Sequence, residues 1–200
     1  RYPELYKLWG DRLREVSGKK IITMVRDPIR RSVSAMFHGI YQDCIDDIET
    51  GKGLYDNTVS HIVKDADCGK SGKMFEWFHE ELEKATGIDI FKYEFNKEAG
   101  YGIIREDGIE ILILVMEKMN QNANVIRDFV GIDRMQHFTL SRQNVGNEKN
   151  YKYLYRAVIE SLQIPSWVLD FYYRDNAGMQ HFYTDKDIQL FCSSYNTNGI

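Results

Sequence analysis

Three arginines and a serine lie close together in the segment Ile21–Phe37, which reads IITMVRDPIRRSVSAMF. Arg30 and Arg31 precede Ser34 by four and three residues, so a helix would place them on one flank. Arginine binds phosphate through paired hydrogen bonds, and a serine hydroxyl adds a short donor. With Arg26 just upstream, the segment predicts an anion site. The same arginines can instead form surface ion pairs with Asp27 or a glutamate, and the residue types leave both interpretations open.

The elements around this cluster could form an anion site. Lys19–Arg26 (KKIITMVR) predicts a short buried strand, and Asp27 and Pro28 suit the N-cap and the first position of a helix. That helix has an apolar stripe made of Ile29, Val33, Met36, Phe37 and Ile40. In open α/β sheets, ligands bind beyond the carboxyl ends of the strands, and a helix N-terminus offers unpaired N–H groups. This strand–helix junction is therefore a candidate anion site, with surface ion pairs as an equally weighted alternative.

The remaining elements predict an α/β fold with a sheet covered on both faces, in one domain over residues 1–200. Tyr41–Gly72 indicates loops with short helices, and Lys73–Thr86 indicates a helix that ends at Gly87. Tyr101–Glu117 predicts two strands around an Asp107-Gly108 turn, with the second strand inside a sheet. Three further helices are expected at Asn122–Val130, Tyr151–Gln163 and from Thr184 onward.

A second candidate anion site is the loop Asn144–Lys149 (NVGNEK). Gly146 would let the backbone approach a phosphate closely, and Lys149 would supply a positive charge, with Arg142 just upstream. The loop can equally be a turn that caps the following helix.

Other residue patterns point away from metal and nucleophilic chemistry. Cys68–Lys73 (CGKSGK) lacks the first glycine of a phosphate-binding loop, because Lys64 stands there.

The five histidines show no metal-binding spacing, so we expect no metal, and the three cysteines are expected to be reduced. His79 beside Glu80 is a candidate general base, but a solvated polar helix face is the favoured explanation of the pair, so the catalytic base is unassigned. Glu117 is expected to pair with an arginine, and Trp77 and Phe78 to belong to the core.

Composition excludes several classes of protein. The chain has 26 basic and 30 acidic residues, a net charge of −4, and 43% hydrophobic residues. Broad nucleic-acid binding is disfavoured because it requires a basic excess. The longest apolar run, Ile109–Met116, is too short to cross a bilayer, and no signal peptide begins the chain. We expect a cytoplasmic location if the source is bacterial.

The motif VRDP-x-x-R-x-x-S resembles the 3′-phosphate-binding motif of sulfotransferases that use 3′-phosphoadenosine-5′-phosphosulfate (PAPS). ILILVMEKMNQNANVIRDFVGI, LSRQNVGNEKNY and HFYTDKDI resemble later segments of that superfamily, in its order. WFHEELEKATGIDIFKYEFNKEAGY resembles its bacterial group named for capsular polysaccharide synthesis. The resemblance covers roughly residues 19 to 191.

The resemblance implies a three-layer sandwich of the P-loop kind with a mainly parallel sheet. It also implies sulfuryl transfer from PAPS to a hydroxyl of a carbohydrate, in capsular or extracellular polysaccharide synthesis. Arg26 and Ser34 would hold the 3′-phosphate of the donor, with Arg31 as a further basic contact. Gly146 and Lys149 would lie against the same region of the nucleotide.

One family feature has no counterpart here. Arg1–Lys19 contains no strand followed by a Gly/Ser-rich turn, which in sulfotransferases holds the 5′-phosphosulfate, so we expect a domain truncated at its N-terminus. Two alternatives follow. One is a non-catalytic module that binds a nucleotide or a partner. The other is a nucleotide-sugar transferase with Asp65-Ala66-Asp67 as a metal site, although a solvated acidic turn is the favoured explanation of that triplet.

Overall fold

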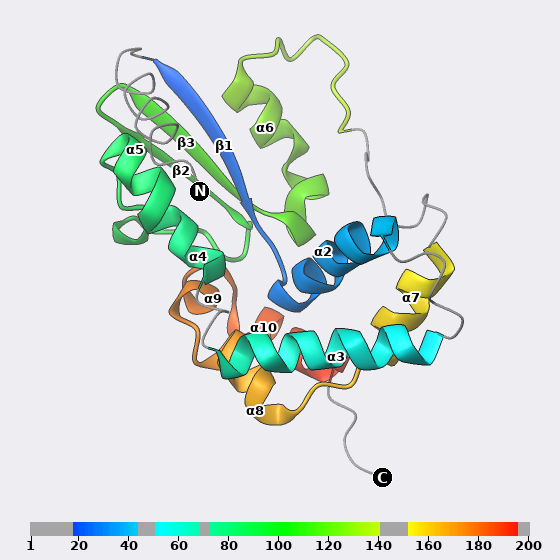
Figure 1. Cartoon of the computed structure of the whole chain (residues 1–200). Coiled ribbons are helices and arrows are strands. Elements are labelled where there is room, and N and C mark those ends of the chain that lie inside the picture. The colour runs from blue at the N-terminus through cyan, green and yellow to red at the C-terminus, as the bar shows by residue number, and fades with distance from the viewer. Residues whose placement is uncertain (1–17, 44–50, 69–72, 141–151, 196–200) are drawn as a thin grey trace. The chain divides into compact units, whose positions relative to one another are not determined.

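The computed structural model describes residues 18–43, 51–68, 73–140 and 152–195 (Figure 1). These residues belong to two compact units, each built from separate stretches of the chain. The first unit includes residues 18–25, 73–140 and 181–184. The second includes residues 26–43, 51–68, 152–180 and 185–195. No described helix is both long enough and apolar enough to span a membrane.

The first unit is organised around a three-stranded sheet of order β1-β3-β2 (Figure 1). The strands are β1 (Lys19–Val25), β2 (Tyr101–Glu106) and β3 (Ile109–Val115). β1 pairs with β3 in parallel, with Lys19 opposite Ile109 and Val25 opposite Val115. β2 pairs with β3 in the antiparallel sense. The predicted α/β class, the hairpin and the central place of the second hairpin strand are confirmed.

Two predictions about this sheet are wrong for the described residues. The sheet is mixed rather than mainly parallel, because the tight turn at Asp107 and Gly108, with φ of 49° and 74°, joins antiparallel neighbours. β1 is an edge of the described sheet rather than a buried strand, so its side chains alternate, and Ile22 and Met24 are 42% and 51% exposed. The three-layer sandwich and the P-loop fold stay predictions.

Helices lie on opposite sides of the sheet (Figure 1). On one side is α6 (Ala123–Val130), which follows a 3-10 helix at Met116–Asn122; Ile126 and Phe129 pack against Leu112 and Leu114 of β3. On the other is a continuous helical stretch: α4 (Lys73–Trp77), a π-helix (Phe78–Glu83) and α5 (Lys84–Thr86), ending at the left-handed Gly87. A 3-10 helix at Ile90–Lys92 follows it.

An aromatic cluster fills the core of the first unit. Phe182 is fully buried, and its ring lies 5.1 to 5.7 Å from those of four phenylalanines: Phe75, Phe78, Phe91 and Phe95. Glycine suits position 102 of β2, because a Cβ there would lie 2.9 Å from the ring of Phe95. The strand and the aromatic cluster are therefore in direct contact.

The second unit is helical. Its helices are α2 (Pro28–Asp43), α3 (Gly51–Asp67), α7 (Lys152–Ser161), α8 (Ser166–Leu169), most of α9 (Ala177–Phe182) and α10 (Asp185–Tyr195), with a π-helix at Asp170–Arg174. α2, α3 and α7 pack on one another. Their buried side chains include Ile29, Val33, Met36, Phe37, Ile62 and Val158.

The length of α3, 17 residues, differs from the prediction, since Tyr41–Gly72 indicates loops with short helices. Thr58, Ile62 and Ala66 are spaced by four residues and are all buried, which gives α3 a packed face despite its polar composition. The helix expected after Asp27, with an apolar stripe as far as Ile40, is confirmed and runs on to Asp43. The expected helices at 73–86, 122–130, 151–163 and after Thr184 are confirmed to within two residues at most ends. The side chain of Ile40 lies outside the described residues.

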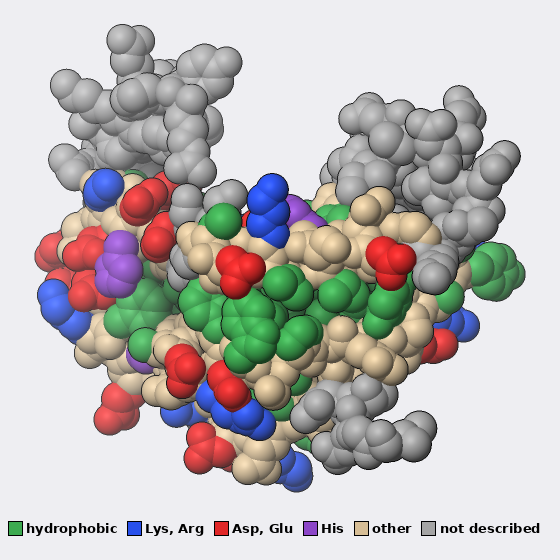
Figure 2. All heavy atoms as spheres, turned by 60° about the horizontal axis from the view of Figure 1, so that its bottom comes forward, with side chains coloured by type: hydrophobic (Ala, Val, Ile, Leu, Met, Phe, Trp, Pro, Cys, Tyr) green, Lys and Arg blue, Asp and Glu red, His purple; other side chains and the backbone are tan. Residues whose placement is uncertain are grey.

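Large apolar side chains also remain exposed in the second unit, among them Trp167 on α8 and Leu190 on α10. Figure 2 shows hydrophobic side chains next to one another on the surface that it presents.

Candidate functional site

Asp27 is the centre of the polar site in the second unit. It is the second residue after β1 and directly precedes the first residue of α2, and its side chain is completely buried. Its Oδ1 accepts hydrogen bonds from the backbone N–H groups of Ile29, at 2.9 Å, and Arg30, at 3.1 Å. Asp27 is thus the N-cap of α2, as its sequence position predicted.

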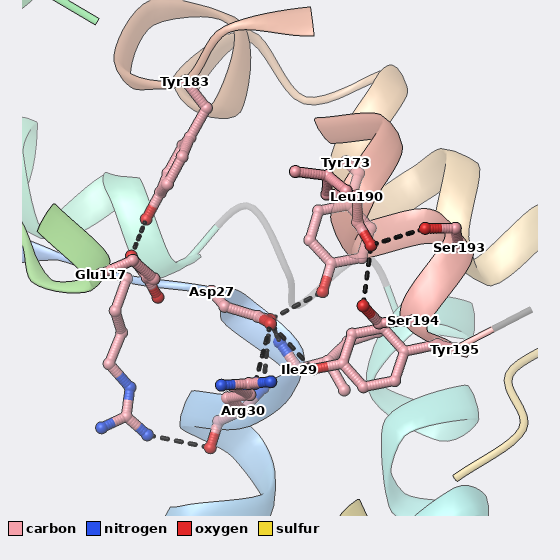
Figure 3. Close-up of polar contacts among 11 residues, drawn as sticks. Asp27, Ile29, Arg30, Glu117, Tyr173, Tyr183, Leu190, Ser193, Ser194 and Tyr195 are labelled. Carbon is pink, nitrogen blue, oxygen red and sulfur yellow. Dashed lines mark hydrogen bonds and ion pairs between the residues drawn. The ribbon is translucent and has the colours of Figure 1, made fainter. Parts of the chain in front are cut away.

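Two buried tyrosines complete the surroundings of the Asp27 carboxylate (Figure 3). The Tyr173 hydroxyl donates to Oδ1 at 2.6 Å, and the Tyr195 hydroxyl donates to Oδ2 at 2.7 Å. Tyr173 comes from the π-helix at Asp170–Arg174, and Tyr195 ends α10. Both carboxylate oxygens therefore have donors, which a buried charge requires.

Burial and the neighbouring negative charge of Asp27 both raise the pKa of Tyr173 and of Tyr195. Both hydroxyls therefore stay protonated and act as donors at neutral pH. Arg30 lies at the edge of the same network, with Nε 3.7 Å from Oδ2 of Asp27. Burial lowers the pKa of Arg30, but a hydrogen bond with Tyr195 and the charge of Asp27 outweigh it, so the net shift is upward. Arg30 is thus a structural partner of Asp27.

The start of α2 differs from the expectation that its N–H groups would be free for an anion. Pro28 has no N–H group, and those of Ile29 and Arg30 bond to the Asp27 side chain. The N–H of Arg31 bonds to the Asp27 carbonyl at 2.9 Å. The first turn is therefore already satisfied, and an anion there would have to be bound by side chains.

Three side chains remain available for that purpose. Arg26 donates from Nη2 to the Arg30 carbonyl at 2.9 Å, which holds its guanidinium beside the first turn of α2. Its Nε atom is buried and has no hydrogen-bond partner among the described residues. Arg31 is exposed and Ser34 is half-buried. Successive residues of a helix are turned by about 100°, so Ser34 lies between Arg30 and Arg31 around the helix axis. Arg30, Arg31 and Ser34 therefore share one flank of α2.

The predicted second anion loop cannot be compared with this geometry. Gly146 and Lys149, with Arg142, lie outside the described residues, as do Gly69–Gly72 of the CGKSGK segment. Of Arg1–Lys19, the segment that is expected to lack a phosphosulfate loop, the structure describes only Gly18 and Lys19.

Other predicted residues have ordinary partners. Glu117 accepts a hydrogen bond from Tyr183 at 3.0 Å (Figure 3), and Phe78 is buried as expected, whereas Trp77 is 37% exposed. Cys68 and Cys192 are free thiols.

Asp65 and Asp67 lie inside α3, and residues two apart in a helix point about 200° away from each other. Asp65 forms an ion pair with His61, with 3.3 Å between the atoms. This arrangement disfavours a shared metal site at the Asp65-Ala66-Asp67 triplet.

His79 pairs with Glu83 rather than with Glu80. Its Nδ1 atom lies 2.9 Å from the Glu83 carboxylate. In a helical stretch the residue one turn away is the neighbour, and the adjacent residue is not.

Sequence reasoning missed Tyr173 and Tyr195 as members of the site. They lie 146 and 168 residues from Asp27 in the chain, and nothing in their spacing marks them among thirteen tyrosines. The signal that was available is Asp27 itself, because a carboxylate followed by a buried helix must find donors.

Comparison with known proteins yields one family. No curated protein and no solved structure matches the chain significantly. A family model does match residues 56–184, which is more than half of the chain and runs from α3 through α9. On that match, the chain belongs to the family described as putative capsular polysaccharide synthesis protein.

Proposed function

We propose that this chain is the nucleotide-binding part of a sulfotransferase that transfers a sulfuryl group from PAPS to a hydroxyl of a carbohydrate during capsular polysaccharide synthesis. Membership of the capsular polysaccharide synthesis family supports a role with polysaccharides. The sulfuryl donor rests on the motif VRDP-x-x-R-x-x-S, in which Arg26, Arg31 and Ser34 would bind the 3′-phosphate.

The observation that carries the proposal is the hydrogen bonding of the Arg26 guanidinium. One of its N–H donors is used by the Arg30 carbonyl, and Nε is buried without a partner among the described residues. A buried donor of this kind costs free energy unless an acceptor reaches it. A phosphate oxygen is a suitable acceptor, and Arg31 and Ser34 on the adjoining flank of α2 would add a second charge and a hydroxyl.

The role of Asp27 in this proposal is to position Arg26 rather than to touch the donor. Its side chain fixes the first turn of α2, and the Arg30 carbonyl in that turn holds the Arg26 guanidinium. The positive charge of Arg30 balances the negative charge of Asp27. The strand–helix junction therefore has a net positive charge from Arg26 and Arg31.

PAPS would supply the sulfuryl group, whose bond to the phosphate oxygen breaks as a bond to the acceptor oxygen forms; the acceptor proton passes to a base that stays unassigned. Arg26, Arg31 and Ser34 would bind the 3′-phosphate, which is at the opposite end of the donor from the sulfur. They should therefore determine donor affinity and orientation more than the bond-breaking step.

The test is a calorimetric titration of the whole chain with adenosine 3′,5′-bisphosphate, with 5′-AMP as the ligand that lacks the 3′-phosphate. We expect the bisphosphate to bind more tightly than 5′-AMP. Arg26→Ala should weaken bisphosphate binding by about 1.5–3 kcal/mol, roughly 10- to 150-fold, and should leave 5′-AMP unaffected.

The matched control is Arg105→Ala, which removes an exposed arginine of β2 in the first unit and should change neither affinity. Equal binding of the two nucleotides, or an unchanged affinity in Arg26→Ala, would contradict the proposed site. Magnesium-dependent binding of a nucleotide sugar would favour the other transferase class instead.

A further inference from the structure

His79, Glu83 and Asp89 form a cluster in the first unit that the proposed nucleotide site does not use. One nitrogen of His79 and one oxygen from each carboxylate all lie within 4.8 Å of one another. His79 and Glu83 are one turn apart in the π-helix Phe78–Glu83. Asp89 comes into place two residues after Gly87, where the left-handed backbone ends the helix. We infer that these three residues form a binding site for a divalent transition-metal ion of the zinc class.

The donor set suits such an ion. An imidazole nitrogen with carboxylate oxygens is a combination that zinc accepts, and three protein ligands leave a further position for water. A tetrahedral zinc ion with bonds of about 2.1 Å holds its ligand atoms roughly 3.4 Å apart. Side-chain movements of about 1 Å would therefore bring the three atoms onto one ion.

Phe91 holds two of the three ligands in place. Its backbone N–H donates to Oδ1 of Asp89 at 3.1 Å, and its ring stacks on the His79 imidazole with centroids 5.0 Å apart and planes at 28°. Oδ2 of Asp89 therefore stays directed away from the backbone. Outer groups that orient the ligands in this way are typical of metal sites, and their loss commonly weakens metal binding 10- to 100-fold.

The charges around the cluster favour a cation. Two carboxylates meet one histidine, and Lys92, the cation paired with Asp89 at 3.5 Å, has a side chain that is 76% exposed. A lysine so exposed can leave the carboxylate without being buried elsewhere. An incoming metal ion would replace both the Lys92 contact and the hydrogen bond between His79 and Glu83.

The chain offers a matched control in its second unit. His61 and Asp65 form the same kind of pair, one turn apart on α3, with His61 47% exposed against 54% for His79. Among the described residues no third ligand joins that pair. If a histidine beside a carboxylate were enough to bind metal, both pairs would bind.

The test uses the full-length chain without a histidine tag and Co²⁺ as a spectroscopic probe, followed by competition with Zn²⁺. We expect one Co²⁺ ion to bind with visible bands of nitrogen and oxygen ligation and without the near-ultraviolet band of cysteine ligation. Zn²⁺ should displace it. His79→Ala should lower Co²⁺ affinity at least about 10-fold, and His61→Ala should leave it unchanged.

Asp89→Asn is the second variant, because an asparagine oxygen can still accept from Phe91 N–H while the negative charge is lost. It should lower the affinity to a similar extent without disturbing the fold, as circular dichroism would show. Unchanged affinity in both His79→Ala and Asp89→Asn would overturn the site, as would cysteine ligation or an absence of binding. None of these outcomes depends on whether adenosine 3′,5′-bisphosphate binds.

Discussion

Asp27 and Asp89 begin two helical segments in the same way, yet their surroundings differ completely. In each case Oδ1 accepts from the backbone N–H two residues ahead, in Ile29 and in Phe91. Oδ2 of Asp27 is bonded to the buried Tyr195, whereas Oδ2 of Asp89 faces the exposed Lys92. The local motif therefore decides that an aspartate caps a helix, and distant packing decides whether its second oxygen is left for a ligand.

The largest expected difference between the two caps is in stability. Asp27→Ala removes a buried charge and leaves two buried tyrosine hydroxyls without their acceptor, so we expect a loss of about 3–5 kcal/mol in the free energy of unfolding. Asp89→Ala removes a cap at a partly exposed position and should cost about 1 kcal/mol. Urea denaturation of both variants gives the two values, and equal losses would contradict the distinction.

The next effect concerns the tyrosines and alkaline pH. Tyr195→Phe removes a hydrogen bond to a buried carboxylate and should cost about 1.5–3 kcal/mol at neutral pH. Because the folded protein raises the pKa of Tyr173 and Tyr195 above the ordinary value of 10, the unfolded chain loses these protons first. The contribution of these two tyrosines to the free energy of unfolding is fully present below pH 10 and is lost as the pH rises above 10.

Urea denaturation between pH 9 and 11 measures this loss. Above pH 10 each such tyrosine adds a slope of up to about 1.4 kcal/mol per pH unit, and Tyr195→Phe should remove one share of it. Tyr153→Phe on α7, where the side chain is 74% exposed, serves as the control and should leave the slope unchanged. A slope identical in Tyr195→Phe and the parent protein would show that Tyr195 ionises equally in both states.

The smallest expected effect is the loss of stability when either histidine pair is removed in the absence of metal. His79→Ala and His61→Ala each remove an exposed pair, so each should cost less than about 1 kcal/mol, and the two costs should be similar. Thermal unfolding in the presence of a chelator measures both. A much larger cost for His79→Ala would assign that residue a packing role through its stack on Phe91 rather than a ligand role.

The sequence predicted local features of the fold well. Asp27-Pro28 marked the start of α2, Asp107-Gly108 marked the hairpin, and Gly87 marked the end of a helix, because each depends on backbone conformation or a cap within a few residues. It missed the length of α3, because the packed face of that helix consists of Thr58, Ile62 and Ala66 and has too few large apolar residues to predict a long helix.

The sites were predicted less completely, for a physical reason. The position of Arg26 beside the first turn of α2 followed from adjacent residues, but the donors to Asp27 come from the far end of the chain. Likewise, Asp89 could not be assigned to His79 and Glu83 from spacing, because the turn at Gly87 sets its position. Contacts made by tertiary packing leave no periodic trace in the sequence.

The burial of Phe182 also has a consequence for how the protein is made. The four phenylalanines around it come from residues 75–95, and the sheet that they contact is complete by residue 115. A chain still emerging from the ribosome has synthesised all of these before Phe182 exists. The aromatic core of the first unit therefore cannot close until Phe182 has been synthesised, and until then its phenylalanines depend on one another or on a chaperone for protection from water.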